Sequence, residues 1–223
     1  MTSKPTLLCL HGGGSNNDIT PFQTGGLKLQ DRFECIYLHA PHVARQCYPG
    51  LENFSDGPFY TWSDTSKSLE DQEDQWEDSL VYIAEYCKRK GPFAGVYGFS
   101  QGAAIITNFS HPTIWKDKFK MSVCPWKFAI LGCAGASHRL TISKGVTINM
   151  PSFHILGLKD RHLNDSRTIS QFWDKSQKAT FTHDRGHEID MQMWKREKEL
   201  MERLNEFLNV CAPTNKGIIG SIR

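Results

Sequence analysis

The sequence predicts one α/β domain in which a mostly parallel central sheet carries helices on both faces. Strand-like and helix-like stretches alternate along the 223 residues, a pattern typical of parallel strands joined by helical crossovers. A chain of this length has room for a sizeable core. No internal repeat, low-complexity tract or linker breaks the alternation. Residues 1–210 are therefore assigned to one domain, and residues 211–223 to a tail that we expect to be flexible.

The strands are short and apolar. They are predicted at residues 6–10, 33–38, 93–97, 127–132, 152–156 and 179–182. Between the first two we expect a helix over residues 19–30, which Gly25 and Gly26 weaken. Residues 42–64 are interpreted as irregular because proline and glycine recur among aromatic residues.

Two longer helices complete the pattern. Residues 68–90 carry acidic residues early and Lys88-Arg89-Lys90 late, which matches the helix dipole. The apolar stripe of this helix is Leu69, Trp76, Leu80, Ile83 and Cys87. A closing helix is expected over residues 190–208, with Trp194, Leu200, Leu204 and Leu208 facing inward.

Charge and cysteine content exclude several classes of protein. The net charge is +2 and no basic block occurs, so neither nucleic acid nor an anionic membrane surface is an expected partner. Seven cysteines without a Cys-x-x-Cys pair indicate a reducing compartment rather than a disulfide scaffold. The first residues lack a signal-peptide core, and no apolar stretch reaches the roughly 18 residues of a membrane span. A cytoplasmic protein is the expectation.

The strongest functional signal is Gly98-Phe99-Ser100-Gln101-Gly102. It follows a predicted strand and precedes a helical stretch, a context in which the serine lies on a tight turn with its hydroxyl exposed. Gly98 and Gly102 occupy positions where a side chain would collide with the neighbouring strand or helix. We interpret Ser100 as a nucleophile; the alternative is a purely structural glycine-rich turn.

A serine nucleophile requires a base and an orienting acid, which follow in the order acid, then histidine. Asp160 comes just after the strand at residues 152–156, where open α/β sheets place their sites. His187 lies on the loop before the closing helix, and Gly186 beside it permits a sharp turn. Asp165 and His183 are the alternatives, although Asp165 is expected to cap the next helix.

The same loops bear on metal binding and on the oxyanion hole. His183 and His187 have the spacing of a helical metal pair, but Gly186 and the preceding strand argue against a helix there. We expect no metal and no cofactor. The oxyanion donors are predicted to be the backbone N–H groups of Gln101 and of Gly13, with Gly14 as the alternative.

These segments together resemble the FSH family of serine hydrolases, an α/β-hydrolase group named from fungi. The resemblance covers residues 6–190 in the family's order and is carried by Leu8-Cys9-Leu10-His11-Gly12, Gln23-Thr24-Gly25, Gly57-Pro58-Phe59-Tyr60-Thr61-Trp62, Gly98-Phe99-Ser100-Gln101-Gly102-Ala103, Gly157-Leu158-Lys159-Asp160 and Gly186-His187. It implies the α/β-hydrolase fold and gives Ser100, Asp160 and His187 the roles of nucleophile, acid and base. Three glycines after the first strand, and the basic run around Asp160, depart from the expected pattern.

The substrate is less well defined by the residues. The aromatic segment of residues 48–62 has a composition suited to a cap over an apolar cleft, and Phe59, Tyr60 and Trp62 are the predicted substrate contacts. A second cap is predicted within residues 111–126, where aromatic residues alternate with lysines. The alternative is that both sets of aromatic residues pack beneath long loops.

The resemblance implies acyl transfer to water through an acyl-serine. Several members of the family are stand-alone thioesterases of fungal polyketide pathways, so the first hypothesis is release of an acyl chain from an acyl carrier domain. Arg161 and the lysines of residues 111–127 are then candidate contacts for that domain, or merely a solvated face. The second hypothesis is a general carboxylesterase for small or medium esters. The third is a catalytically inactive binding partner.

Overall fold

The computed structural model describes residues 3–142 and 145–213 and contains a six-stranded parallel sheet. In spatial order its strands are β2 (Glu34–Leu38), β1 (Thr6–Leu10), β5 (Gly95–Phe99), β6 (Ala129–Gly132), β7 (Ser152–Gly157) and β8 (Lys178–His183). The predicted α/β architecture is confirmed. Because all six strands run the same way, the loops that follow them meet at a single edge of the sheet.

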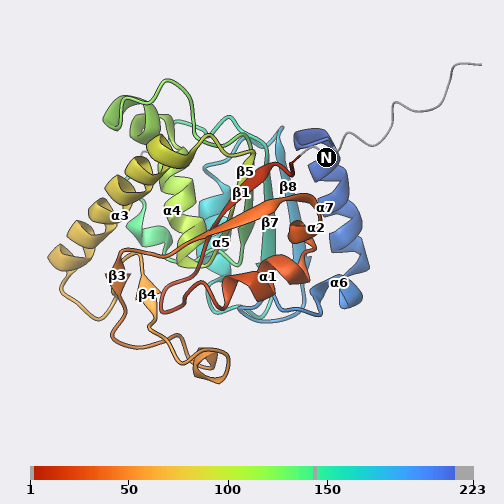
Figure 1. The fold of residues 1–223 in the computed structure, drawn as a ribbon, viewed down its shortest axis with the longest axis horizontal. Helices are drawn as coiled ribbons and strands as arrows, with labels where there is room; N and C mark the ends of the chain where they lie inside the picture. Colours follow the sequence, from red (N-terminus) through yellow and green to blue (C-terminus); the bar gives the residue numbers. More distant parts are fainter. Residues whose placement is uncertain (1–2, 143–144, 214–223) are drawn as a thin grey trace, which may run out of the picture.

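Helices cover both faces of this sheet (Figure 1). One layer consists of α3 (Leu69–Lys90), α4 (Gln101–Ser110) and α5 (Leu163–Ser170); the other consists of α1 (Thr20–Gly26), α2 (Leu29–Arg32), α6 (Met193–Arg196) and α7 (Lys198–Cys211). Alternate residues of a strand point to opposite faces, so Leu8 and Leu10 join the core under α3 and α4. Leu7 and Cys9 join the core under α7.

Two helices differ from the prediction because each is divided by a non-helical residue. The stretch predicted over residues 19–30 is split by Lys28, whose φ of 55° is left-handed. The closing helix is divided into α6 and α7 at Glu197, and Met193 rather than Trp194 is the buried residue of α6. The ring of Trp194 lies instead under the ammonium groups of Lys28, Lys195 and Lys198.

The apolar stripe of α3 begins later than predicted. Leu69 is 71% exposed, whereas Trp76, Leu80 and Ile83 are buried. Leu69 is the first residue of the helix, next to the capping Ser68, whose hydroxyl accepts a hydrogen bond from the N–H of Asp71 at 3.1 Å. An end residue projects beyond the sheet, so helical periodicity alone does not bury it.

The segment between β2 and α3 contains more regular structure than predicted. His42–Val43 (β3) pairs antiparallel with Tyr60–Thr61 (β4), and a short 3-10 helix spans Leu51–Asn53. The segment predicted as a second cap contains a π-helix over Thr113–Lys118. Trp126 is buried there against Phe109 and donates to Ser110 Oγ at 3.0 Å. This second segment therefore packs on the core and does not line the cleft described below.

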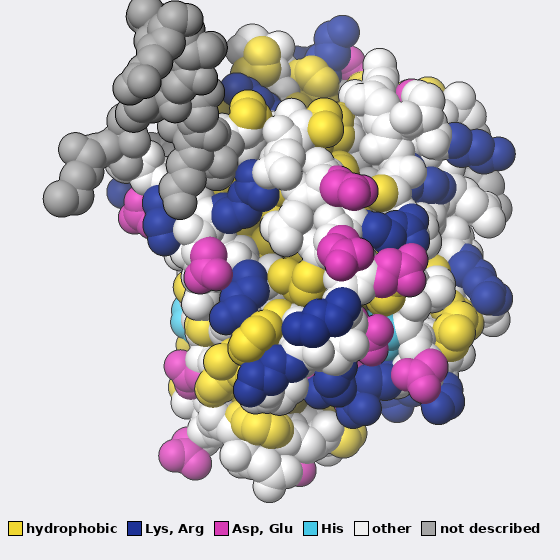
Figure 2. Space-filling model, turned by 90° about the vertical axis from the view of Figure 1, so that its right-hand side faces the viewer, with side chains coloured by type: hydrophobic (Ala, Val, Ile, Leu, Met, Phe, Trp, Pro, Cys, Tyr) yellow, Lys and Arg dark blue, Asp and Glu magenta, His cyan; other side chains and the backbone are white. Residues whose placement is uncertain are grey.

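The surface around α6 and α7 is mixed in character. On the face that carries α6 and α7, basic and acidic side chains are interspersed with hydrophobic ones (Figure 2). All seven cysteines are free thiols. Among the described residues, no helix combines the length and the apolar character that a membrane crossing requires. The predicted tail begins inside α7, which ends at Cys211, and residues 214–223 lie outside the described residues.

A buried histidine in β7 gives the fold a pH dependence. Burial, with a smaller contribution from the charge of Lys178, lowers the pKa of His154 to about 3, and its Nε2 contacts Ser152 Oγ at 3.0 Å. The unfolded chain binds a proton near pH 6.5 that the folded chain does not bind. The free energy of unfolding therefore falls as pH falls below about 6.5.

We expect chemical denaturation between pH 6.5 and 4.5 to show this loss, with a slope of up to about 1.4 kcal/mol per pH unit from each such histidine. His154→Gln should be less stable at neutral pH but should show a smaller slope than the parent protein. Equal slopes in the two proteins would show that His154 is not the source.

Candidate active site

Ser100 lies on a strained turn between β5 and α4. Its φ of 54° and ψ of −119° are unusual for a residue with a side chain. A Cβ on Gly102 would lie 2.5 Å from the carbonyl oxygen of His11, and a Cβ on Gly98 would lie 2.8 Å from the backbone of Gly102. The predicted collisions at both glycines are confirmed, and the close approach fixes where the serine hydroxyl points.

The loops after β5, β7 and β8 bring Ser100, Asp160 and His187 together. Nε2 of His187 lies 2.9 Å from Ser100 Oγ, and Nδ1 lies 2.8 Å from Asp160 Oδ2. The other carboxylate oxygen of Asp160 accepts the N–H of His162 at 2.8 Å. The side chains of Asp160 and His187 are almost completely withdrawn from water.

The protonation of this trio follows from its hydrogen bonds. Burial alone would raise the pKa of Asp160, but the hydrogen bonds from His187 and His162 outweigh burial and lower it. The resulting carboxylate only accepts, so Nδ1 of His187 carries the proton. Nε2 is then free to accept the hydroxyl proton of Ser100, which is the arrangement that general-base catalysis requires.

The alternative acid and base lie elsewhere. Asp165 accepts from Ser137 and from Nδ1 of His162, and the residue at the cap position of α5 is His162 rather than Asp165. His183 is buried at the end of β8, with its Nε2 3.8 Å from the sulfur of Cys133. Neither residue contacts Ser100 or His187 by a hydrogen bond within the described part of the chain.

The glycine that brings the acid and base loops together is Gly157 rather than Gly186. A Cβ on Gly157 would lie 2.3 Å from the carbonyl oxygen of Gly186, whereas a Cβ on Gly186 would meet nothing closer than 3.8 Å. The N–H of Lys159 also donates to the carbonyl oxygen of Arg185 at 2.9 Å. The chain does bend at residues 184–187, before and at the histidine that lies beside Ser100, but the space at Gly186 shows that this bend does not require glycine.

His11 orients the loop that follows β1. Nε2 of His11 accepts the N–H of Ala40 at 2.9 Å. The single ring proton is therefore on Nδ1, which donates to the carbonyl oxygen of Gly12 at 2.7 Å. Burial lowers the pKa of His11 to about 4 and keeps the ring neutral. Because the C=O and N–H of one peptide unit point in opposite directions, this bond also sets the direction of the Gly13 N–H.

Two backbone N–H groups near Ser100 are available to bind a ligand. Among residues 3–142 and 145–213, the backbone N–H groups of Gly13 and Gln101 donate to no other group. Gln101 opens α4, where the first N–H groups of a helix lack partners. The loop lies close to the serine, since a Cβ on Gly12 would be 3.2 Å from Ser100 Cβ.

Trp62 is a core residue, which corrects the prediction that it contacts substrate. Its side chain is fully buried, its Nε1 donates to the carbonyl oxygen of His11 at 2.8 Å, and its own carbonyl accepts from Ser79 at 2.7 Å. Its backbone N–H donates to the side-chain oxygen of Gln101 at 2.8 Å. Trp62 therefore ties β1, α3 and α4 together beneath the site.

The cleft above Ser100 has two arms, each with a volume of about 470 Å³. The apolar arm is lined by Phe22, Leu51, Phe54, Phe99, Ile189 and Met191, and His187 faces it. The polar arm is lined by Arg45, Asp64, Ser66, Arg161 and His162. Ser100, Gly13 and Tyr48 line both arms, so the serine stands at their junction.

The predicted aromatic contacts Phe59 and Tyr60 line neither arm, and Tyr60 packs against His39. The aromatic residue that the prediction missed is Tyr48, whose ring lies 5.4 Å from that of His187. Its N–H donates to the carbonyl oxygen of Gly14 at 2.9 Å, and a Cβ on Gly14 would lie 2.7 Å from that nitrogen. Gly14, the third glycine after β1, leaves room for the backbone of Tyr48. It was therefore the feature of the sequence that could have indicated this approach.

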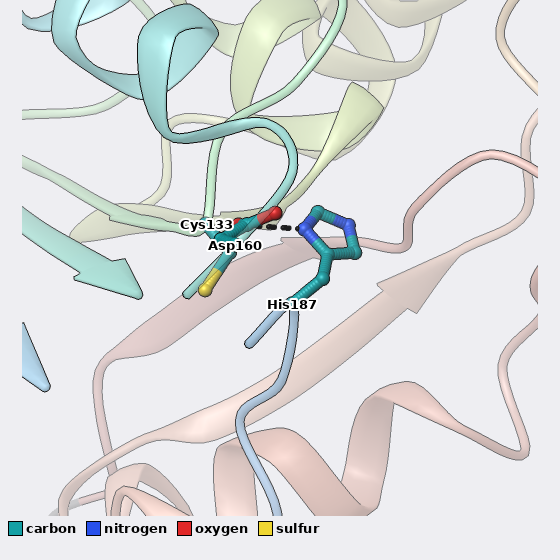
Figure 3. Close-up of side chains that lie close together, drawn as sticks. All are labelled: Cys133, Asp160 and His187. Atoms are coloured by element: carbon teal, nitrogen blue, oxygen red, sulfur yellow. Dashed lines mark hydrogen bonds and ion pairs between the residues drawn. The ribbon is translucent and has the colours of Figure 1, made fainter. Parts of the chain in front are cut away.

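One cluster has the composition of a metal site. Ligand atoms of Cys133, Asp160 and His187 lie within 4.8 Å of one another. In Figure 3 a dashed line marks the hydrogen bond between the Asp160 carboxylate and the His187 imidazole, and the sulfur of Cys133 points away from the ring. Burial, reinforced by the charge of Asp160, raises the pKa of the Cys133 thiol. A thiolate ligand is therefore disfavoured here, and Asp160 and His187 are engaged with each other.

Comparison with known proteins identifies the family. A model described as serine hydrolase (FSH1) matches residues 1–198. The chain belongs to this family. Esterase FUS5 of Gibberella moniliformis (strain M3125 / FGSC 7600) is 30% identical over 183 residues, covering 76% of this serine hydrolase and 72% of that protein. Esterase FPY3 of Fusarium mangiferae is 30% identical over 206 residues, covering 82% and 87%.

A solved structure supports the fold of this serine hydrolase. The Bacillus cereus carboxylesterase has a TM-score of 0.54 at 18% identity, covering 93% of this chain and 89% of that chain. The FSH-family resemblance and the α/β-hydrolase fold inferred from the sequence are thus confirmed.

The turn at Ser100 generates a prediction about glycine. Gly102→Ala should destabilise this serine hydrolase by about 1–3 kcal/mol, because the added methyl group meets the backbone carbonyls of Leu10 and His11 rather than a flexible side chain. Gly145→Ala is the matched control, since a Cβ there meets nothing within 4 Å. Chemical denaturation of both variants is the measurement. Equal stability of the two would contradict the proposed steric constraint.

Proposed function

We propose that Ser100 is the nucleophile of a serine hydrolase that cleaves carboxylic esters or acyl thioesters. His187 removes the hydroxyl proton as Ser100 attacks the carbonyl carbon, and then gives that proton to the leaving oxygen or sulfur. Water then attacks the acyl carbon while His187 removes a proton from it; the bond to Ser100 Oγ breaks, the acid is released, and His187 returns the proton to Ser100. The observation that carries the proposal is the continuous chain of hydrogen bonds from Ser100 through His187 to Asp160.

The N–H groups of Gly13 and Gln101 are proposed to stabilise the oxyanion of each tetrahedral intermediate. Within the described part of the chain these N–H groups donate to no other group, which supports this role, as does the orientation that His11 imposes on the peptide unit between Gly12 and Gly13. Loss of one such donor typically reduces turnover by about 10²–10³-fold. No metal or organic cofactor enters these steps.

The apolar arm supports an apolar group on the substrate. Phe22, Phe54 and Met191 expose large hydrophobic side chains and all line this arm, which is typical of a binding surface. Within this class we propose that the substrate is an acyl thioester whose chain is released from an acyl carrier domain. The runner-up is a general carboxylesterase, a reading favoured by the fungal relatives, which are named esterases.

Exchanging the acid should separate folding from catalysis. Asp160→Asn is expected to fold normally but to lose about 10³–10⁴-fold in kcat, because the imidazole loses the acceptor that sets its tautomer. Asp184→Asn, on the loop before His187, removes a carboxylate that is exposed and serves as the control. Circular dichroism and ester hydrolysis measure the two effects. Near-parent turnover of Asp160→Asn would remove this residue from the proposed mechanism.

Two assays test the substrate class. A fluorophosphonate probe should label the parent protein and not Ser100→Ala; no labelling of the parent would favour an inactive binding partner. Hydrolysis of p-nitrophenyl esters is then compared with hydrolysis of acyl-carrier and acyl-N-acetylcysteamine thioesters of graded chain length. We expect thioesters to be the better substrates. Much faster turnover of short oxygen esters would overturn the thioesterase proposal and leave the carboxylesterase.

A further inference from the structure

The polar arm carries two arginines beside the proposed nucleophile. Arg45 and Arg161 both line it and both are exposed to solvent. Among the described residues, neither guanidinium lies within ion-pair distance of a carboxylate. We propose that these arginines bind an anionic group, a carboxylate or a phosphate, on an ester whose apolar portion occupies the other arm. This inference rests on the proposed ester hydrolysis at Ser100.

Arg161 is held in place by a chain of hydrogen bonds. Its Nε donates to Nε2 of His162 at 3.1 Å, so the ring proton of His162 is on Nδ1, which donates to Asp165 at 3.2 Å. Ser137 in turn donates to Asp165 through both its N–H and its hydroxyl. This chain restricts the arginine before any ligand arrives, which lowers the entropic cost of binding.

The ring of Tyr48 fixes the other side of the guanidinium. The central carbon of Arg161 lies 5.0 Å from the ring centroid of Tyr48, within the range of a cation–π interaction. Nε is the nitrogen that donates to His162, and the terminal nitrogens lie toward Tyr48 with no carboxylate partner among the described residues. A guanidinium that presents two parallel N–H groups matches the oxygens of a carboxylate or phosphate.

Arg45 and Asp64 set the remaining charge of the arm. The Asp64 side chain is buried, and its Oδ1 accepts from the N–H and the hydroxyl of Ser66 at 2.9 and 2.7 Å. Burial alone would raise the pKa of Asp64, but these hydrogen bonds and the charges of Arg45 and Lys67 lower it. The lining of the arm therefore includes one buried carboxylate and two exposed guanidinium groups, so its net charge is positive.

The anionic group has two possible sources in the substrate. It belongs either to the acyl part or to the leaving group, since Ser100 stands at the junction of the arms. Two matched pairs of esters distinguish them. 4-Nitrophenyl glutarate monoester is compared with 4-nitrophenyl pentanoate for a charged acyl part. 4-Carboxyphenyl hexanoate is compared with 4-carbamoylphenyl hexanoate for a charged leaving group.

The readout is the ratio of kcat/KM for the anionic ester to that for its neutral partner. We expect this ratio to exceed one in at least one pair and to fall by about tenfold in Arg161→Gln and in Arg45→Gln, mainly through KM. The ratio should also fall in Arg161→Lys, because an ammonium group lacks the two parallel N–H donors of a planar guanidinium. Arg167→Gln, an exposed arginine of α5 that lines neither arm, is the control and should keep the parent ratio.

A binding measurement separates this inference from the hydrolysis on which it rests. Calorimetric titration of Ser100→Ala with each of the two anionic esters should give, for at least one of them, a Kd that weakens about tenfold when Arg161→Gln is added. If the parent hydrolyses neither charged nor neutral esters, the proposed function fails, yet this arginine-dependent binding still tests the anion site. A preference for neutral esters in both pairs, or ratios and Kd values unchanged by the arginine variants, would overturn the proposal.

Discussion

The contact between the first turn of α4 and the end of β1 is the constraint on which the site depends. Gly102 lies so close to the carbonyl oxygens of Leu10 and His11 that no Cβ fits between them. This approach places the loop after β1 beside Ser100, and within the described residues the N–H groups of Gly13 and Gln101 donate to no other group. The strained backbone of Ser100 is tolerated because all ten residues of α4 are buried and hold the turn in position.

Buried polar groups around this contact are used for alignment rather than for substrate. The side chain of Gln101 accepts from Thr61 and from the backbone of Trp62, and donates to Ser63 at 2.7 Å. Gln101 thereby joins the start of α4 to the segment that precedes α3. Both acceptor positions of the amide oxygen and one of its two N–H donors are thus used within the protein, which holds the side chain in one orientation at the edge of the polar arm.

Sequence reasoning succeeded where one linear segment carries the whole signal. The strand, turn and helix around Ser100 are such a segment, and Asp160 could be placed at the same edge of the sheet because it comes shortly after a strand. It failed where the reason is a contact between distant segments. Only glycine fits at position 157, because the carbonyl oxygen of Gly186 lies too close for a Cβ. The indole of Trp62 is held inside by its hydrogen bond to the carbonyl of His11. Neither partner can be deduced from the residues adjacent in the sequence. Aromatic content alone therefore suggested a substrate contact in place of a core residue.

The contact that positions Arg161 also bears on the proposed base. The rings of His162 and His187 lie 5.0 Å apart, and in the proposed mechanism His187 becomes a cation when it takes the proton of Ser100. A protonated His162 at that distance would oppose this step, because like charges repel strongly in a partly buried site. The N–H of Arg161 requires a lone pair on Nε2 of His162, so the ring is neutral while the contact exists. The hydrogen bond that aims the guanidinium into the polar arm thus leaves the imidazolium of His187 without a competing charge from its neighbouring ring.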